Sequence, residues 1–113
     1  MNKIYQRIRH ILDFGIDIVL GARQEQNGDV KRNHENIARM WNAFLFHKLK
    51  DGQKITGSDA ASLMGLLKVA RTLSGRFNLD DYIDGATYHA ISGALKEDEV
   101  EIKFNEQGNL ESK

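Results

Sequence analysis

The sequence predicts an all-α fold: a four-helix domain followed by a short C-terminal tail that is β-like or disordered. Proline is absent from the 113 residues, so nothing in the sequence forbids long helices. Four segments carry apolar residues at steps of three and four, the spacing of one helix face. The last segment alternates apolar and charged residues, which is typical of a strand. We therefore divide the chain into a helical domain, residues 1–96, and an acidic tail, residues 97–113.

Composition and charge indicate a folded globular chain and exclude several kinds of partner. Hydrophobic residues make up 41% of the chain and charged residues 28%, as in ordinary globular proteins. Sixteen basic residues balance sixteen acidic ones, so we expect no nucleic-acid or membrane partner. The absence of cysteine excludes disulfides and thiolate metal sites. No apolar run approaches the roughly 20 residues of a membrane span, and we expect a cytoplasmic protein.

The first two helices are predicted on either side of a long polar connection. Residues 2–20 carry Ile, Leu and Val at helical spacing. Gly15 lies inside this helix and marks a close contact or a weak point, because glycine costs a helix interior up to about 1 kcal/mol. The second helix is predicted over residues 34–49, with Asn33 as its cap. The connection reads GARQEQNGDVKRNHEN, residues 21–36.

The third helix is predicted in TGSDAASLMGLLKVARTLSG. Thr56 together with Asp59, or Ser58 alone, is the expected cap, and Gly75 is the expected stop. The apolar side chains point in most directions around the helix axis. Such a helix is normally the central and most buried one.

The fourth helix is predicted from about Asp80 to Lys96, after which the pattern changes. Val100, Ile102 and Phe104 alternate with charged residues, which predicts a strand. A single strand leaves its backbone groups unpaired. The tail must therefore fold back as a hairpin, pair with another chain or remain loose.

The polar connection is the first candidate for a binding site. Arg23, Gln24, Gln26, Asn27 and Asn33 can donate hydrogen bonds to phosphates or to the edge of a base. Neither GxxxxGK[ST] nor GxGxxG occurs in it. Two interpretations therefore stay open, a solvated connection and a wall of a ligand site.

Two cations on the third helix are the second candidate. Lys68 and Arg71 stand three residues apart on one helix face, in a segment that otherwise favours burial. One possible counter-charge is internal, because Asp81 and Asp84 have the same spacing in the fourth helix. The other is the carboxylate or phosphate of a ligand. A metal site is not expected, since the four histidines show no ligand spacing.

Four ordered motifs resemble a small family of uncharacterised tailed-phage and prophage proteins. They are GARQEQNGD, NHENIARMW, LLKVAR and DDYIDGATY, against the usual GDRQxxYGD, NFxxIAxLW, LLKxAR and DNxxDxAGY. The likeness covers roughly residues 8–95. This sequence departs from the family pattern at Ala22, Asn27, His34, Asp81 and Thr87. The family brings no activity that can be transferred to it.

A more remote resemblance is to the all-α nucleoside triphosphate pyrophosphatases of the MazG and dimeric dUTPase type. Those proteins hold Mg²⁺ with an ExxE motif on one helix and an ExxD motif on the next. Asp81-Tyr-Ile-Asp84 is similar to the second motif and is followed by the family's aromatic at Tyr88. Lys68 and Arg71 stand where the first motif should be, so the resemblance does not extend to the carboxylates of that motif.

The leading hypothesis is therefore a phage or prophage accessory protein that binds a nucleotide or related phosphorylated small molecule without a cofactor, and that forms a homo-oligomer. One alternative is a degenerate pyrophosphohydrolase, which alone would need Mg²⁺; whether the chain is an enzyme stays open. Another is an interaction module that binds a host protein through the tail. The residues expected to bind the ligand are Arg23, Gln24, Asn33, Lys68, Arg71, Asp81, Asp84 and Tyr88.

Overall fold

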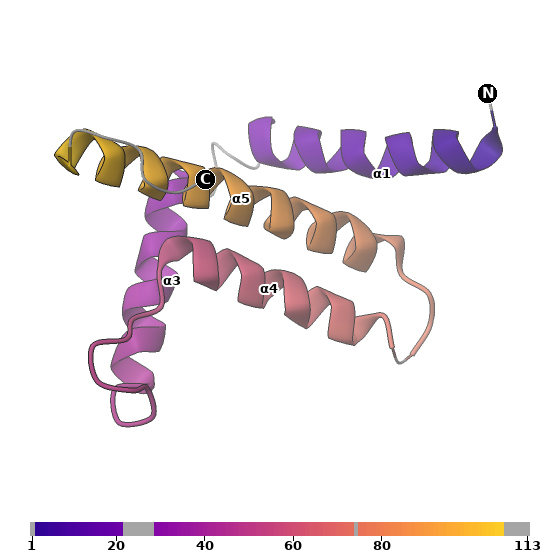
Figure 1. Cartoon of the computed structure of the whole chain (residues 1–113). Helices are drawn as coiled ribbons and strands as arrows, with labels where there is room; N and C mark the ends of the chain where they lie inside the picture. Colours follow the sequence, from indigo (N-terminus) through magenta and orange to yellow (C-terminus); the bar gives the residue numbers. More distant parts are fainter. Residues whose placement is uncertain (1, 22–28, 74, 108–113) are drawn as a thin grey trace.

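The structure, a computed structural model, describes residues 2–21, 29–73 and 75–107. This part of the chain forms four helices and no strand (Figure 1). They are α1 (Lys3–Leu20), α3 (Val30–Phe44), α4 (Gly57–Arg71) and α5 (Leu79–Gln107). The all-α, four-helix prediction is confirmed. Among the described helices, none has the length and apolar character needed to cross a membrane.

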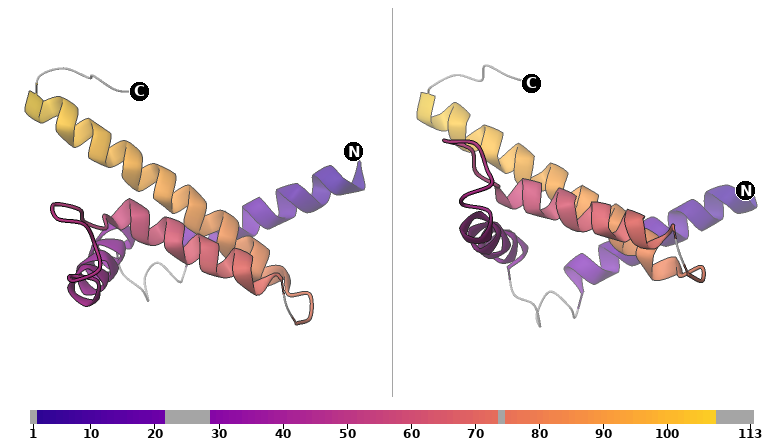
Figure 2. Two further views of the ribbon diagram at one scale, coloured as in Figure 1. Left: turned by 60° about the horizontal axis from the view of Figure 1, so that its bottom comes forward. Right: turned by 90° about the horizontal axis from the view of Figure 1, so that it is seen from below.

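Helices α4 and α1 pack against α5, and α3 packs against α4. Helix α4 runs antiparallel to α5 along one of its sides, and α1 crosses α5 on another side (Figures 1 and 2). Helix α3 packs against the start of α4 and crosses it steeply. Since α1 packs mainly on α5 and α3 mainly on α4, the assembly is open rather than a closed bundle.

Small residues hold α4 and α5 together. Ala60 and Ala61 of α4 are fully buried, and Gly65 is so close to α5 that a Cβ there would lie 3.5 Å from the carbonyl oxygen of Gly85. The prediction that this helix is the most buried holds only in part. Its small side chains are buried, whereas its large ones, such as Leu66 at 63% exposure, face outward.

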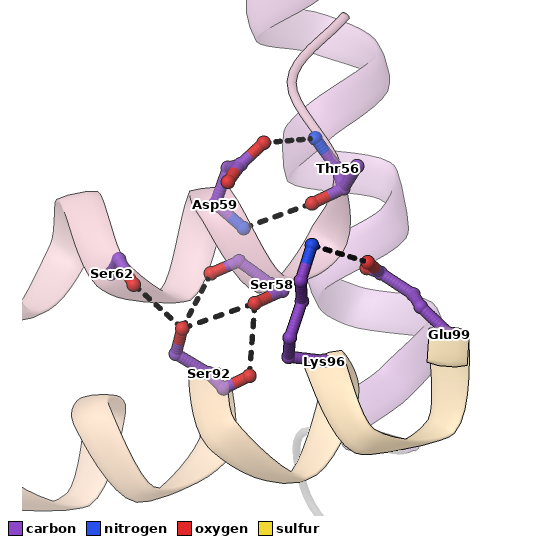
Figure 3. A network of polar contacts seen from close by, with 7 residues as sticks. All are labelled: Thr56, Ser58, Asp59, Ser62, Ser92, Lys96 and Glu99. Atoms are coloured by element: carbon purple, nitrogen blue, oxygen red, sulfur yellow. Dashed lines mark hydrogen bonds and ion pairs between the residues drawn. The ribbon is translucent and has the colours of Figure 1, made fainter. Parts of the chain in front are cut away.

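Three serines join the same two helices through hydrogen bonds (Figure 3). The Ser58 hydroxyl donates to the carbonyl oxygen of Ser92 at 2.9 Å, and the Ser92 hydroxyl donates to the carbonyl oxygen of Ser58 at 2.9 Å. The Ser62 and Ser92 hydroxyls lie 2.6 Å apart. These bonds satisfy polar groups that would otherwise be buried without a partner, and they set the register between α4 and α5.

Of the two helix caps predicted from the sequence, the cap of α4 is observed and the cap of α3 is not. Asn2 caps α1, and Thr56 with Asp59 forms the predicted capping box of α4 (Figure 3). The prediction that Asn33 caps the second helix is wrong. Asp29 is the cap, because its carboxylate accepts from the backbone N–H groups of Lys31 and Arg32 at 2.8 and 3.2 Å.

The early start of α3 shortens the polar connection that the sequence predicts. Residues 30–36 belong to the first two turns of α3, so they are not part of a sixteen-residue loop. Residues 22–28 lie outside the described part of the chain. Helix α3 also ends at Phe44, five residues before the predicted end, and a turn follows it.

The strand prediction for the tail is wrong as far as residue 107. Helix α5 passes the proposed boundary at residues 96 and 97 without a break and continues to Gln107. Extending an existing helix avoids the cost of nucleation, and this stretch is rich in Lys and Glu, which are good helix formers. The Lys96 ammonium lies 3.8 Å from the carboxylate of Glu99, three residues further along the helix (Figure 3). Residues 108–113 lie outside the described part.

Gly15 marks a close contact, one of the two roles predicted for it. It is the buried residue of α1, and a Cβ on it would overlap the Thr87 hydroxyl of α5. The two helices cross at this point because glycine lets their backbones approach.

Candidate functional site

The two cations of α4 are paired with the two carboxylates of α5. The Lys68 ammonium lies 3.2 Å from Asp84, and the Arg71 guanidinium lies 3.1 Å from Asp81. The antiparallel packing of α4 and α5 accounts for this, because residues near the end of α4 lie beside the start of α5. The internal counter-charge, one of the two alternatives left open by the sequence, is therefore present.

The two pairs differ in their exposure to solvent. The Asp81 side chain is 8% exposed, whereas Arg71 is 56% exposed, so the carboxylate lies inside and the guanidinium covers it from the surface. Lys68 and Asp84 are both mostly buried, at 17% and 26%. Within the described residues, no group of three or more His, Asp or Glu side chains could hold a metal ion. Asp81 and Asp84 thus act as partners of cations from α4.

The remaining predicted ligand residues do not all join this cluster. Tyr88 lies one turn beyond Asp84 on α5 and packs edge-on against His34 of α3, with ring centroids 6.0 Å apart. Asn33 is half-buried on α3 next to His34. Arg23 and Gln24 lie outside the described residues. A ligand role for any of these residues stays a prediction.

A different part of the molecule forms a groove with cationic and aromatic walls, which we call the basic groove. It lies between the first turns of α1 and the start of α5 and has a volume of about 760 Å³. Its polar and aromatic lining consists of Lys3, Gln6, Arg7, His10, Phe77 and Tyr82. No acidic residue is among the described residues that line it.

The basic groove combines two kinds of contact. Lys3 and Arg7 have no described carboxylate within ion-pair distance, in contrast to Lys68 and Arg71. On the opposite wall, the rings of Phe77 and Tyr82 lie 5.8 Å apart and are tilted by 34°. Cations bind phosphate and carboxylate groups, and exposed aromatic rings provide surfaces for stacking.

Sequence reasoning missed the basic groove. The signal within α1 is the recurrence of Lys3, Arg7 and His10 at steps of four and three, which places them on one side of a helix. The aromatic wall comes from a segment about 70 residues away along the chain. Periodicity within one helix does not reveal which distant segment lies opposite.

One further ion pair connects the start of α3 to the second half of α5. The Lys31 ammonium lies 2.8 Å from Asp98. The hydrogen bond to Asp98, followed by the charge of the same carboxylate, raises the pKa of Lys31 above its usual 10.5. Together with the contact between His34 and Tyr88, this pair connects α3 to α5.

Comparison with known proteins agrees with the phage resemblance read from the motifs. The family described as "Domain of unknown function (DUF6378)" matches residues 10–96. The Gene 55 protein of Mycobacterium phage L5 is 37% identical over 81 residues, which are 72% of this chain and 49% of that protein. The Gene 55 protein of Mycobacterium phage D29 is 28% identical over 91 residues, which are 80% of this chain and 56% of that protein.

The chain spans about half the length of these curated relatives. No solved structure matches it. The remoter resemblance to pyrophosphatases stays a prediction. Because the family match extends over most of the chain and the two relatives come from phages, the chain belongs to the DUF6378 family and is similar to phage proteins.

Proposed function

We propose that this chain is a phage accessory protein that binds a nucleotide or a related phosphorylated small molecule in the basic groove. The observation that carries the proposal is the pairing of Lys3 and Arg7 on one wall with Phe77 and Tyr82 on the other. A nucleotide has both features that these walls complement, an anionic phosphate chain and a flat aromatic base.

The size and charge of the basic groove support this ligand class. Its volume of about 760 Å³ lies within the range of about 300–1,000 Å³ typical of small-molecule sites. No acidic residue is among the described residues that line the groove, so no carboxylate in its wall neutralises Lys3 and Arg7. The cations of α4 support the proposal less, because Asp84 and Asp81 already neutralise Lys68 and Arg71.

The experiment is a calorimetric titration of the full chain with common ribonucleoside and deoxyribonucleoside triphosphates, in EDTA and again with Mg²⁺. Inorganic triphosphate and adenosine alone are separate titrants. We expect at least one nucleotide to bind more tightly than either fragment, because only a nucleotide engages both walls. Binding in EDTA agrees with direct recognition by cations. If no nucleotide binds under either condition, the proposal is overturned.

Substitutions on α1 locate the site. Arg7→Ala should weaken binding roughly tenfold or more, because a hydrogen bond to a charged group contributes about 1.5–3 kcal/mol and about 1.4 kcal/mol corresponds to a factor of ten. Arg9→Ala is the matched control. Arg9 lies about 200° further around the helix, is highly exposed and pairs with Asp13 at 3.6 Å, so its loss should leave binding unchanged.

A substitution on the aromatic wall tests the second contact. Tyr82→Leu should also weaken nucleotide binding about tenfold, because stacking on an aromatic side chain contributes about 1–3 kcal/mol per base. It should leave the binding of inorganic triphosphate unchanged. Equal effects of Arg7→Ala and Arg9→Ala would overturn the assignment, as would a loss of binding in Lys68→Ala but not in Arg7→Ala.

A further inference from the structure

The apolar face of α1 is only partly covered. Helix α1 crosses α5 at Gly15, and away from this point its apolar side chains are open to solvent. Leu12 is 52% exposed, Ile16 is 54% exposed and Leu20 is 72% exposed. An amphipathic helix normally buries such a stripe, so α1 lacks a second neighbour.

These residues form one wall of a second cavity, which we call the apolar groove. It has a volume of about 530 Å³ and lies between the second half of α1 and the middle of α5. Leu12, Ile16 and Leu20 line one wall, and Ala90, Ala94 and Leu95 line the other. The apolar groove and the basic groove adjoin at Ile11, which lines both; Leu12 and Ile16 face the former, while Gln6 and His10 face the latter.

The chain exposes far more surface than a folded monomer of its mass. Its accessible area is 9073 Å², whereas a monomeric protein of 12.8 kDa exposes about 6,300 Å². Its radius of gyration is 16.4 Å, compared with about 13 Å for a compact domain of this length. Part of this exposed area belongs to the apolar side chains of the described helices, and an obligate homodimer covers roughly 1,000–2,500 Å² of each subunit.

The order of charges along α1 indicates what covers this face. Its first half carries Lys3, Arg7 and Arg9, and its second half carries Asp13 and Asp17. This order opposes the helix dipole, which favours anions at the start of a helix and cations at its end. A second α1 lying antiparallel would place Arg9 of each copy beside Asp13 of the other copy.

The exposed face of α4 lacks this complementarity. Asp59 lies in the first turn of α4, and Lys68 and Arg71 lie in its last turn, which is the order that suits an isolated helix. Both cations already have partners on α5. The order of charges along α1, and not the order along α4, is therefore the one that an antiparallel second helix would improve.

We propose that a second copy of this chain covers the apolar groove, with the two α1 helices antiparallel across a twofold axis. The same surface then serves both copies, as in isologous dimers. The apolar residues of each α1 fill the groove of the other copy, and Arg9 of one copy lies beside Asp13 of the other. The chain has no net charge at neutral pH, so two copies do not repel each other. The basic groove stays open in such a dimer.

Sedimentation velocity of the full chain over a range of protein concentrations tests the proposal. We expect a species of twice the chain mass, and a single-chain mass at every concentration would overturn the proposal. Ile16→Glu should shift the chain to the monomer, because it places a charge in the apolar groove. Leu66→Glu, at 63% exposure on α4, is the matched control and should leave the dimer intact. The reverse result would overturn the assignment to α1.

Charge reversal tests the antiparallel arrangement without altering an apolar residue. Arg9 and Asp13 are both more than half exposed, so substitutions there leave the fold of each chain intact, as circular dichroism should show. Arg9→Glu and Asp13→Lys should each weaken the dimer at least tenfold. Each variant places two like charges side by side at both of the contacts between residue 9 of one copy and residue 13 of the other. Mixing the two variants should restore a heterodimer. Failure of the mixture to associate would overturn the antiparallel pairing.

Discussion

The crossing of α1 and α5 at Gly15 gives a prediction that can be worked out atom by atom. A Cβ added at Gly15 would overlap the Thr87 hydroxyl oxygen, while it would lie 3.7 Å from the Thr87 Cβ. The hydroxyl can move away only by rotating χ1, which breaks its 2.7 Å hydrogen bond to the carbonyl oxygen of Ile83. Gly15→Ala should therefore be unfavourable in the wild-type chain and favourable once the hydroxyl is removed by Thr87→Ala.

The magnitudes follow from two opposing terms. Alanine favours a helix interior over glycine by about 0.8–1 kcal/mol, and overpacking costs about 1–3 kcal/mol. Gly15→Ala alone should lower the free energy of unfolding by about 0–2 kcal/mol. In a Thr87→Ala background the same change should raise it by about 1 kcal/mol, because the contact at 3.7 Å is ordinary van der Waals packing. The coupling between the two sites is then about 1–3 kcal/mol.

Urea denaturation measures this coupling when it is applied, at one fixed protein concentration, to the wild-type chain, the two single variants and the double variant. Gly93→Ala on α5 is the control, because a Cβ there meets nothing within 4 Å. It should raise the free energy of unfolding by about 0.5–1 kcal/mol. If the effects of Gly15→Ala and Thr87→Ala add to within about 0.5 kcal/mol, the close crossing is refuted.

Three further predictions concern the ion pairs and the caps. Arg71→Ala should lower the free energy of unfolding by about 1–3 kcal/mol, because Asp81, 8% exposed, loses its partner; an unchanged urea midpoint would contradict this. Thr56→Ala removes the capping box of α4 and should cost about 1 kcal/mol in the same assay. Asp98 raises the pKa of Lys31 above 10.5, so this pair stabilises the folded chain fully below pH 10.5 and is lost as the pH rises through the raised pKa. Lys31→Met should therefore reduce the loss of stability measured between pH 8 and pH 11.5, and equal losses in both chains would disprove the coupling.

The outcomes for particular residues show where local reasoning succeeds. Thr56 and Asp59 lie three residues apart, and their mutual hydrogen bonds need nothing beyond that spacing, so the capping box could be predicted. Asp29 and Asn33 are both competent caps, and choosing between them depends on how α3 packs against α4. The alternation of Val100 and Ile102 fits a strand, but a helix that already exists at residue 96 extends through it at low cost.

The pairing of charges shows the limit most clearly. The sequence indicated that Lys68 and Arg71 need anions and named Asp81 and Asp84 as one source, yet it left a ligand as the other. The 3.2 and 3.1 Å contacts are present because α4 and α5 approach closely at Gly65 and Gly85. This close approach depends on the surfaces of α4 and α5 together, so neither segment predicts it alone.

By itself the sequence determined the all-α class, the approximate positions of four helices, the cap of one of them and the resemblance to phage proteins. These features depend on spacings of a few residues, which any stretch of chain carries within itself. Only the tertiary structure decided which cations are neutralised, and it alone brought Lys3 and Arg7 opposite Phe77 and Tyr82. Such neighbours are set by the packing of helices that are distant along the chain, and this packing depends on the shapes of both surfaces at once.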